Sequence, residues 1–190
     1  MIGLFFGSFN PIHVGHLIIA NYMVEFTDLK EVWFVISPHN PHKAKETLLN
    51  DNHRLQLVRI AIEYNNKLKA STIEFSMPQP SYTADTLAYL KDKYPKKKFA
   101  LIMGSDNLES FHKWKNYEYI LNHYSIYVYP RPKSDGGILR NHENVKMINA
   151  PLVEISASFI RNAIKEKKDV RYMLTDSVYQ YIQEMHFYKK

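Results

Sequence analysis

The stretch that decides the fold runs from Gly7 to His16 and reads Gly-Ser-Phe-Asn-Pro-Ile-His-Val-Gly-His. It follows an apolar, strand-like run from Ile2 to Phe6 and leads into an apolar segment with helical periodicity, Leu17 to Phe26. This order predicts a strand, a tight turn built on small residues, and the start of a helix. Such a turn lets a phosphate approach the backbone, and the N–H groups and positive dipole end of the following helix favour an anion there.

Two histidines flank the same spot. His13 and His16 are three residues apart, so in the first turn of a helix their imidazoles project from one face. Both rings can donate hydrogen bonds to one phosphate chain. A bare His-x-x-His pair is more often an accident of a helix surface or half of a zinc site, but the turn from Gly7 to Pro11 in front of it favours phosphate binding.

The rest of the chain alternates between strand and helix patterns. Strand-like segments cover residues 31–36, 70–75, 99–103, 124–129 and 145–148, and helical segments cover 51–64, 82–94, 156–168 and 175–187, with Thr83 as the N-cap of the second. Strands separated by helices of this length predict an α/β fold, a Rossmann-like doubly wound parallel sheet with helices on both faces. We expect one domain over residues 1–190 with a small C-terminal helical part, about 156–190, and a loop rather than a linker at 130–144.

Ligands of such sheets bind at the carboxyl ends of the strands. Small and polar residues follow four of the predicted strands, at Gly7–His16, Ser37–Lys43, Gly104–Asn107 and Arg131. We therefore expect these four segments to share one cleft.

Composition narrows the kind of partner. The chain has 190 residues, no cysteine and a formal net charge of +6. Without cysteine there is neither a disulfide nor a thiolate metal site, and no apolar run approaches the roughly 20 residues that cross a bilayer, so we expect a cytoplasmic protein without a membrane partner. The positive charge suits nucleic acid, an anionic membrane face or a small polyphosphate, and does not choose among them.

Two motifs, taken together, carry a family resemblance. The Walker A and Gly-x-Gly-x-x-Gly phosphate motifs are missing. The Gly7–His16 stretch instead resembles the signature of the HIGH-type nucleotidylyltransferases, a superfamily that shares this motif with class I aminoacyl-tRNA synthetases. Ile155–Arg161, Ile-Ser-Ala-Ser-Phe-Ile-Arg, resembles the Ile-Ser-x-Thr/Ser-x-x-Arg element of the same superfamily, in which Ser156 or Ser158 would cap a helix.

Three further stretches resemble those of the bacterial nicotinate-nucleotide adenylyltransferases. They are Pro38–Lys43, Tyr82–Leu87, and Gly104–Leu108 with Lys113–Lys115. The chain departs from the family pattern at Phe6, Asn10 and Ala157, where the family usually has glycine, aspartate and serine.

The resemblance implies a reaction. It is adenylyl transfer from ATP to nicotinic acid mononucleotide, giving nicotinic acid adenine dinucleotide and pyrophosphate in NAD biosynthesis, with Mg²⁺ carried in by ATP and no metal-ligating side chain assigned. By the same resemblance the catalytic residues are His13, His16 and Arg161. The ATP-binding residues are Gly7, Ser8, Phe9, Gly15, Gly104, Asp106, Arg131, Ile155 and Ser156, and the acceptor-binding residues are Lys43, Thr83, Thr86 and Trp114.

Other functions remain open at this stage. An adenylyltransferase acting on nicotinamide mononucleotide or phosphopantetheine would share the phosphate motifs, because these locate phosphates better than they identify the acceptor. A basic nucleic-acid-binding module would explain the charge, but RNP, KH and zinc-finger patterns are missing, so we expect no nucleic-acid partner. A synthetase is disfavoured because the chain has little room for an anticodon-binding domain. The sequence leaves open whether the chain forms a homo-oligomer.

Overall fold

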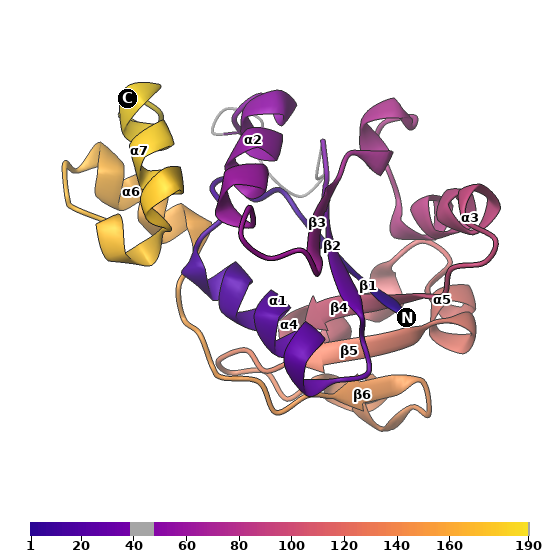
Figure 1. Cartoon of the computed structure of the whole chain (residues 1–190). Helices are drawn as coiled ribbons and strands as arrows, with labels where there is room; N and C mark the ends of the chain where they lie inside the picture. Colours follow the sequence, from indigo (N-terminus) through magenta and orange to yellow (C-terminus); the bar gives the residue numbers. More distant parts are fainter. Residues whose placement is uncertain (39–47, 190) are drawn as a thin grey trace.

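A computed structural model describes residues 1–38 and 48–189 and contains one six-stranded parallel sheet (Figure 1). The spatial order is β3-β2-β1-β4-β5-β6, so the direction of winding reverses between β1 and β4. This is the doubly wound order, in which the reversal point opens a crevice at the carboxyl ends of the strands. The strands are β1 Ile2–Gly7, β2 Glu31–Ile36, β3 Leu68–Ser71, β4 Phe99–Gly104, β5 Ser125–Tyr129 and β6 Val145–Met147.

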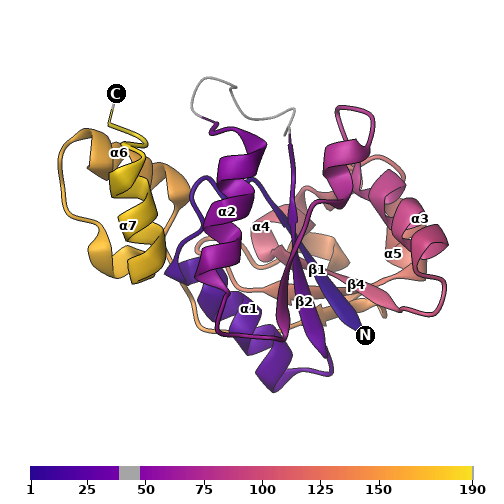
Figure 2. The same ribbon diagram turned by 45° about the horizontal axis from the view of Figure 1, so that its top comes forward.

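Helices cover both faces of the sheet, as the sequence predicts. In Figures 1 and 2, α1 and α2 lie on one side with the pair α6 and α7 beside them, and α3 and α5 lie on the other. Their bounds are α1 Val14–Phe26, α2 Asp51–Ala61, α3 Thr83–Lys93, α4 Ser105–Glu109, α5 Tyr117–His123, α6 Ala157–Lys165 and α7 Asp176–Glu184. Short 3-10 turns lie at Ile73–Ser76, Phe111–Lys113, Gly137–Asn141 and Arg171–Met173. Within the described ranges, none of these helices has the length and apolar character to cross a membrane.

The core lies in two clusters, one on each face of the sheet. Side chains alternate along a strand, so Phe5 of β1 packs into the cluster under α1 and α2, while Leu4 packs into the cluster under α3 and α5. Burial on both faces explains why the central strands β1 and β4 read as continuous apolar runs. Ile160 of α6 and Ile182 of α7 belong to the same cluster as Phe5, so the C-terminal helices share the core of the sheet.

Two local predictions are wrong. The strand predicted over 70–75 ends at Ser71, because β3 is an edge strand and local bonds then replace the ladder: Phe75 N–H donates to the carbonyl of Thr72 at 2.9 Å. The predicted N-cap Thr83 is the first residue of α3, and Tyr82 is the cap, since its carbonyl accepts the N–H of Thr86 at 3.0 Å. At α3 the prediction misses the boundary by one residue, whereas at β3 the strand is Leu68–Ser71 and the alternating Ile73 and Phe75 belong to a 3-10 turn.

Candidate active site

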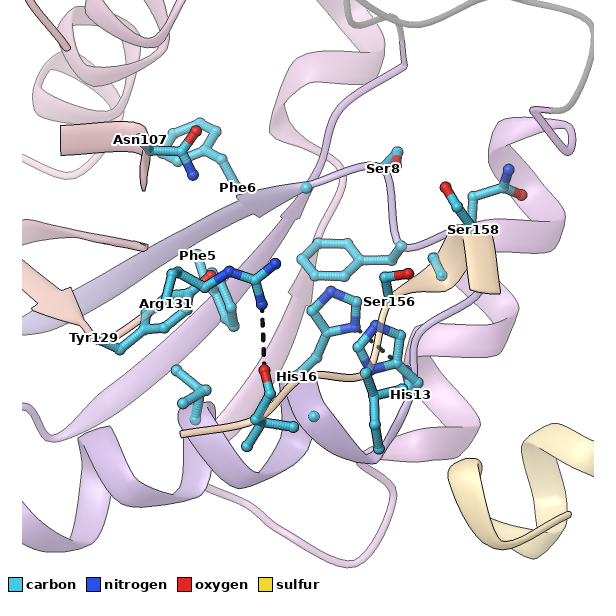
Figure 3. A pocket seen from close by; sticks show the side chains of 18 of the residues that line it. Phe5, Phe6, Ser8, His13, His16, Asn107, Tyr129, Arg131, Ser156 and Ser158 are labelled. Carbon is cyan, nitrogen blue, oxygen red and sulfur yellow. Dashed lines mark hydrogen bonds between the residues drawn. The ribbon is translucent and has the colours of Figure 1, made fainter. Parts of the chain in front are cut away.

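A cavity of about 400 Å³ opens at the carboxyl ends of β1 and β4 (Figure 3). It is lined by the turn after β1 and by residues from the start of α6, two segments that are far apart in the sequence. Eleven of the residues assigned to catalysis or ATP line it: Gly7, Ser8, Phe9, His13, Gly15, His16, Asp106, Arg131, Ile155, Ser156 and Arg161. The structure therefore brings the histidine-containing turn, Gly7–His16, and the segment Ile155–Arg161 to one cavity.

The two histidines lie against each other at the start of α1. Their rings stack with centroids 3.8 Å apart, and the backbone N–H of His13 donates to Nδ1 of the His16 ring at 3.3 Å. His13 is the N-cap of α1, only 5% of its surface is exposed, and its Nδ1 has no hydrogen-bond partner among the described residues. Both imidazoles are thus held on one face of the helix start, as their spacing predicts.

Burial sets the protonation state of His13. It lowers the pKa of the imidazole to about 4, with a further contribution from the positive charge of Arg131. The ring is therefore neutral at pH 7 and carries one N–H.

We expect this shift to make the stability of the protein depend on pH between about 6.5 and 4. In that window the unfolded chain binds a proton at His13 and the folded chain does not, so stability is lost as the pH falls. The loss between pH 7 and pH 4 is about 3 kcal/mol from this group. Urea unfolding of the wild type and of His13→Gln at pH 7 and pH 4 measures this loss, because the variant has no titrating group at position 13 and should lose less free energy of unfolding. A wild type and a variant with the same pH dependence would contradict the assignment.

The segment Ser156–Arg161 places a helix N-terminus and a guanidinium at the cavity. Ser156 is the N-cap of α6 and its Oγ accepts the N–H of Phe159 at 3.1 Å, which confirms the predicted cap. Arg161, one turn later, donates from Nη1 to the carbonyl of Asn10 at 2.7 Å and from Nη2 to Oγ of Ser158 at 3.2 Å. A helix N-terminus with a fixed guanidinium beside it suits a phosphate group.

Gly104 contributes space rather than contact. It ends β4 and does not line the cavity, but a Cβ there would meet the side chain of Asp106 and come within 2.7 Å of Cγ of Arg131. Nε of Arg131 lies 3.8 Å from the carboxylate of Asp106, and its Nη1 donates to the carbonyl of Val153 at 3.4 Å, as Figure 3 shows. Glycine at this position therefore leaves room for the Asp106–Arg131 pair.

A second cavity, of about 750 Å³, adjoins the first. The two share one wall, made of Phe5, Phe6, Gly7, Ser8, Asp106, Asn107 and Tyr129. Of the residues assigned to the acceptor, Thr83 and Trp114 line this second cavity. Two ligands bound in the two cavities would meet at the shared wall.

The other two residues assigned to the acceptor are Thr86 and Lys43. Thr86 does not line either cavity: its hydroxyl donates to the carboxylate of Glu74 at 2.7 Å, and its N–H is taken by the carbonyl of Tyr82. The N–H of Thr86 is therefore already paired within α3, and Thr86 stays a predicted acceptor residue that neither cavity includes. Lys43 lies outside the described residues.

Sequence reasoning missed a buried arginine beneath the turn that follows β1. Arg54 of α2 is fully buried and donates to the carbonyls of Ser8 at 2.6 Å, Ser37 at 3.0 Å and Leu49 at 3.0 Å. It also pairs with the carboxylate of Asp51 at 2.5 Å. Arg54 thereby joins the ends of β1 and β2 to the start of α2. Its position in a helix of mixed polarity gave no signal of burial.

Tyr129 was also missed as a site residue. It ends β5, lines both cavities and packs against Phe5 with ring centroids 5.9 Å apart. Burial raises the pKa of its hydroxyl to about 12, so it remains a protonated donor at neutral pH. It adds a hydrogen-bond donor to the wall that the two cavities share.

Comparison with known proteins agrees with this geometry. Residues 4–163 match the model of the cytidylyltransferase-like family. The chain is 57% identical to the probable nicotinate-nucleotide adenylyltransferase of Cytophaga hutchinsonii over 187 residues, 98% of this chain and 97% of that one, and 56% identical to that of Flavobacterium johnsoniae over 100% and 99% of the two chains. Among solved structures, the Plasmodium falciparum nicotinic acid mononucleotide adenylyltransferase complexed with NaAD superposes with a TM-score of 0.85 at 23% identity, covering 99% of this chain and 97% of that chain, which shows the shared fold. The chain therefore belongs to the cytidylyltransferase-like family and, within it, to the nicotinate-nucleotide adenylyltransferases.

Proposed function

We propose that this chain transfers the adenylyl group of ATP to nicotinic acid mononucleotide, forming nicotinic acid adenine dinucleotide and pyrophosphate. The observation that carries the proposal is the pair of cavities with a common wall. One cavity holds the histidine turn and the α6 corner, and the other holds Trp114 and the start of α3. The names of the relatives support the same acceptor. The reaction is a step in NAD biosynthesis.

The chemistry asks for positioning and charge neutralisation. A phosphate oxygen of the mononucleotide attacks the α-phosphorus of ATP, a new P–O bond forms, and the bond to the bridging oxygen breaks so that pyrophosphate leaves with the electron pair. The attacking oxygen is ionised at neutral pH, so the protein needs neither a general base nor a covalent nucleophile. This fits a cavity whose polar side chains are mainly hydrogen-bond donors.

On the ATP side, His16 donates to the α-phosphate as negative charge develops there. His13, neutral at pH 7, assists with its single N–H. Ser156 with the start of α6, and Arg161, hold the departing pyrophosphate. Asp106 binds a ribose hydroxyl of ATP, Arg131 borders the nucleotide, and Gly104 leaves room for this pair. The backbone contacts to ATP come from Gly7, Ser8, Phe9, Gly15 and Ile155.

Magnesium enters this proposal as part of the substrate, bound to ATP. Within the described part of the chain, histidines and carboxylates do not form a cluster of three that could hold a metal ion. Mg²⁺ typically keeps several waters and takes its remaining oxygens from substrate phosphates. We therefore assign its ligands to the triphosphate and water, and the neutralised triphosphate fits beside Arg161 and α6.

On the acceptor side, Trp114 stacks on the pyridine ring, and the start of α3, at Thr83, receives the nicotinate carboxylate. The residue assigned to the acceptor phosphate is Lys43. The ring of Trp114 is held by Phe111, 5.1 Å away between centroids.

Replacement of Trp114 by alanine is expected to raise KM for the mononucleotide about tenfold or more, because stacking and its buried area are lost. KM for ATP should change little, since Trp114 lines only the second cavity. Steady-state kinetics with each substrate varied in turn measures both constants. Trp114→Phe, which keeps an aromatic face, should recover most of the loss, and an unchanged acceptor KM in Trp114→Ala would remove the stacking role.

A side-by-side turnover assay tests the function itself. The protein is given ATP, Mg²⁺ and one of three acceptors, nicotinic acid mononucleotide, nicotinamide mononucleotide or phosphopantetheine, and pyrophosphate release is followed. We expect the largest kcat/KM with nicotinic acid mononucleotide. A larger kcat/KM with either of the other acceptors would refute the assigned substrate. Retention of the protein on nucleic acid without any ATP turnover would refute the proposed enzymatic activity.

We further propose that residues 1–190 act as one domain in the cytoplasm. The shared core of the sheet with α6 and α7 supports the first point, because Ile160 and Ile182 pack with Phe5. The lack of cysteine and the use of ATP support the second.

A further inference from the structure

The segment that follows α7, Met185–Lys189, bends back toward Asn10 in the turn between β1 and α1. Phe187 packs against His53 of α2 at 4.9 Å and against Tyr181 of α7 at 5.8 Å between ring centroids. His186 and Tyr188 adopt positive φ angles of 55° and 62°, which are uncommon for bulky side chains. The strained backbone is held by packing and brings the side chain of Tyr188 to the turn.

The hydroxyl of Tyr188 hydrogen-bonds to the buried side chain of Asn10. Its hydroxyl donates to Oδ1 of Asn10 at 2.8 Å, and the same oxygen accepts the N–H of Leu49 at 3.2 Å. Asn10 is 3% exposed. Burial raises the pKa of the Tyr188 hydroxyl, which therefore stays protonated and able to donate. The amide oxygen at Asn10 is thus the acceptor of two donors from different parts of the chain.

The backbone of Asn10 binds Arg161, which lines the first cavity. Its backbone carbonyl accepts the hydrogen bond from Nη1 of Arg161 at 2.7 Å. Asn10 itself lines that cavity, next to Ser8. Two hydrogen bonds, one to the side chain and one to the backbone carbonyl of Asn10, therefore connect Tyr188 to Arg161 through this residue.

We propose that Tyr188 is a positioning residue for adenylyl transfer: its hydrogen bond fixes Asn10, and through Asn10 the guanidinium of Arg161 that receives the departing pyrophosphate. The inference rests on the proposed function. It gives the segment after α7 a part in the reaction although the segment lines neither cavity. A small displacement of a group that stabilises the transition state is enough to slow a reaction tenfold or more.

The first test compares two tyrosines of the same region. Tyr188→Phe removes only the hydroxyl that reaches Asn10, and Tyr181→Phe removes a hydroxyl that hydrogen-bonds Nδ1 of His53 at 3.0 Å and does not reach the turn. We expect kcat with ATP and nicotinic acid mononucleotide to fall about tenfold in Tyr188→Phe, with the acceptor KM within about twofold. Tyr181→Phe should keep the wild-type kcat. Equal losses in the two variants would show general loosening of the C-terminal part and overturn the proposal.

A double-mutant cycle tests the route through Asn10. If Tyr188 acts through that side chain, Tyr188→Phe added to Asn10→Ala lowers kcat no further than Asn10→Ala alone. Multiplicative losses would overturn the proposal, as would a wild-type kcat in folded Tyr188→Phe. Thermal unfolding of each variant shows that it is folded, and the Asn10→Ala variant tests the link even if Tyr188→Phe does not fold: a wild-type kcat in it would overturn the route. Failure of the wild type to turn over would instead refute the proposed function.

Discussion

Replacement of His16 by alanine is expected to lower kcat for adenylyl transfer by about 10²- to 10³-fold. The loss is that of one preorganised donor aimed at the phosphate on which charge builds in the transition state. His16 is set for this by its ring stack on His13 at 3.8 Å and by the hydrogen bond that its Nδ1 accepts from the backbone N–H of His13, and its ring lines the cavity. KM for ATP should change much less than kcat, because the start of α6 and Arg161 still bind the triphosphate.

Pyrophosphate release with saturating substrates measures this effect. His123→Ala is the matched control, because this histidine is exposed on α5, away from both cavities, and its contacts are with Tyr119 of the same helix, to whose carbonyl it hydrogen-bonds at 2.9 Å. The control should retain full turnover. Wild-type turnover in His16→Ala would take His16 out of the mechanism.

Replacement of Arg54 by methionine is expected to lower the free energy of unfolding by about 3–5 kcal/mol, because several carbonyls lose the donor that satisfies them and each loss costs about 1–3 kcal/mol. The substitution leaves the carbonyls of Ser8, Ser37 and Leu49 without their donor and the carboxylate of Asp51 without its partner. Unpaired buried acceptors cost more than the hydrogen bonds themselves contribute. The turn after β1 should lose its geometry as well, so kcat should fall together with stability.

Urea unfolding followed by circular dichroism measures the stability change. Arg59→Met is the control, because it makes the same chemical change on the exposed face of the same helix, α2. It should change the free energy of unfolding by less than about 0.5 kcal/mol. Similar changes in the two variants would contradict the structural role of Arg54.

Much of the fold could be predicted from local patterns. The apolar runs of β1, β2 and β4 are continuous because both faces of the sheet are covered, and helices of regular length separate them. The right-handed crossover rule then leaves few arrangements, and the observed strand order is among them. The place of the first cavity followed from the same logic, since the turn after β1 and Arg131 both follow the carboxyl ends of strands. That the Ser156–Arg161 segment joins them was implied only by the family resemblance.

What could not be predicted depends on contacts between distant residues. Arg54 looks like any arginine of a helix, and its burial follows only from the carbonyls that the ends of β1 and β2 bring to it. The contact of Tyr188 with Asn10 joins residues 178 positions apart and is set by the bend after α7. Asn10 could be identified from sequence only as a departure from the family pattern, and the structure shows that its amide oxygen accepts two hydrogen bonds.

The common wall of the two cavities has a consequence for ligand design. Gly7 and Ser8 border both spaces, so a single molecule that tethers an adenosine to a pyridine ribonucleoside across this wall would fill both at once. Once one half is seated, the other half binds at the high effective concentration of an intramolecular partner. Such a bridged compound should compete with ATP and with the mononucleotide alike, and the length of its bridge should decide its affinity.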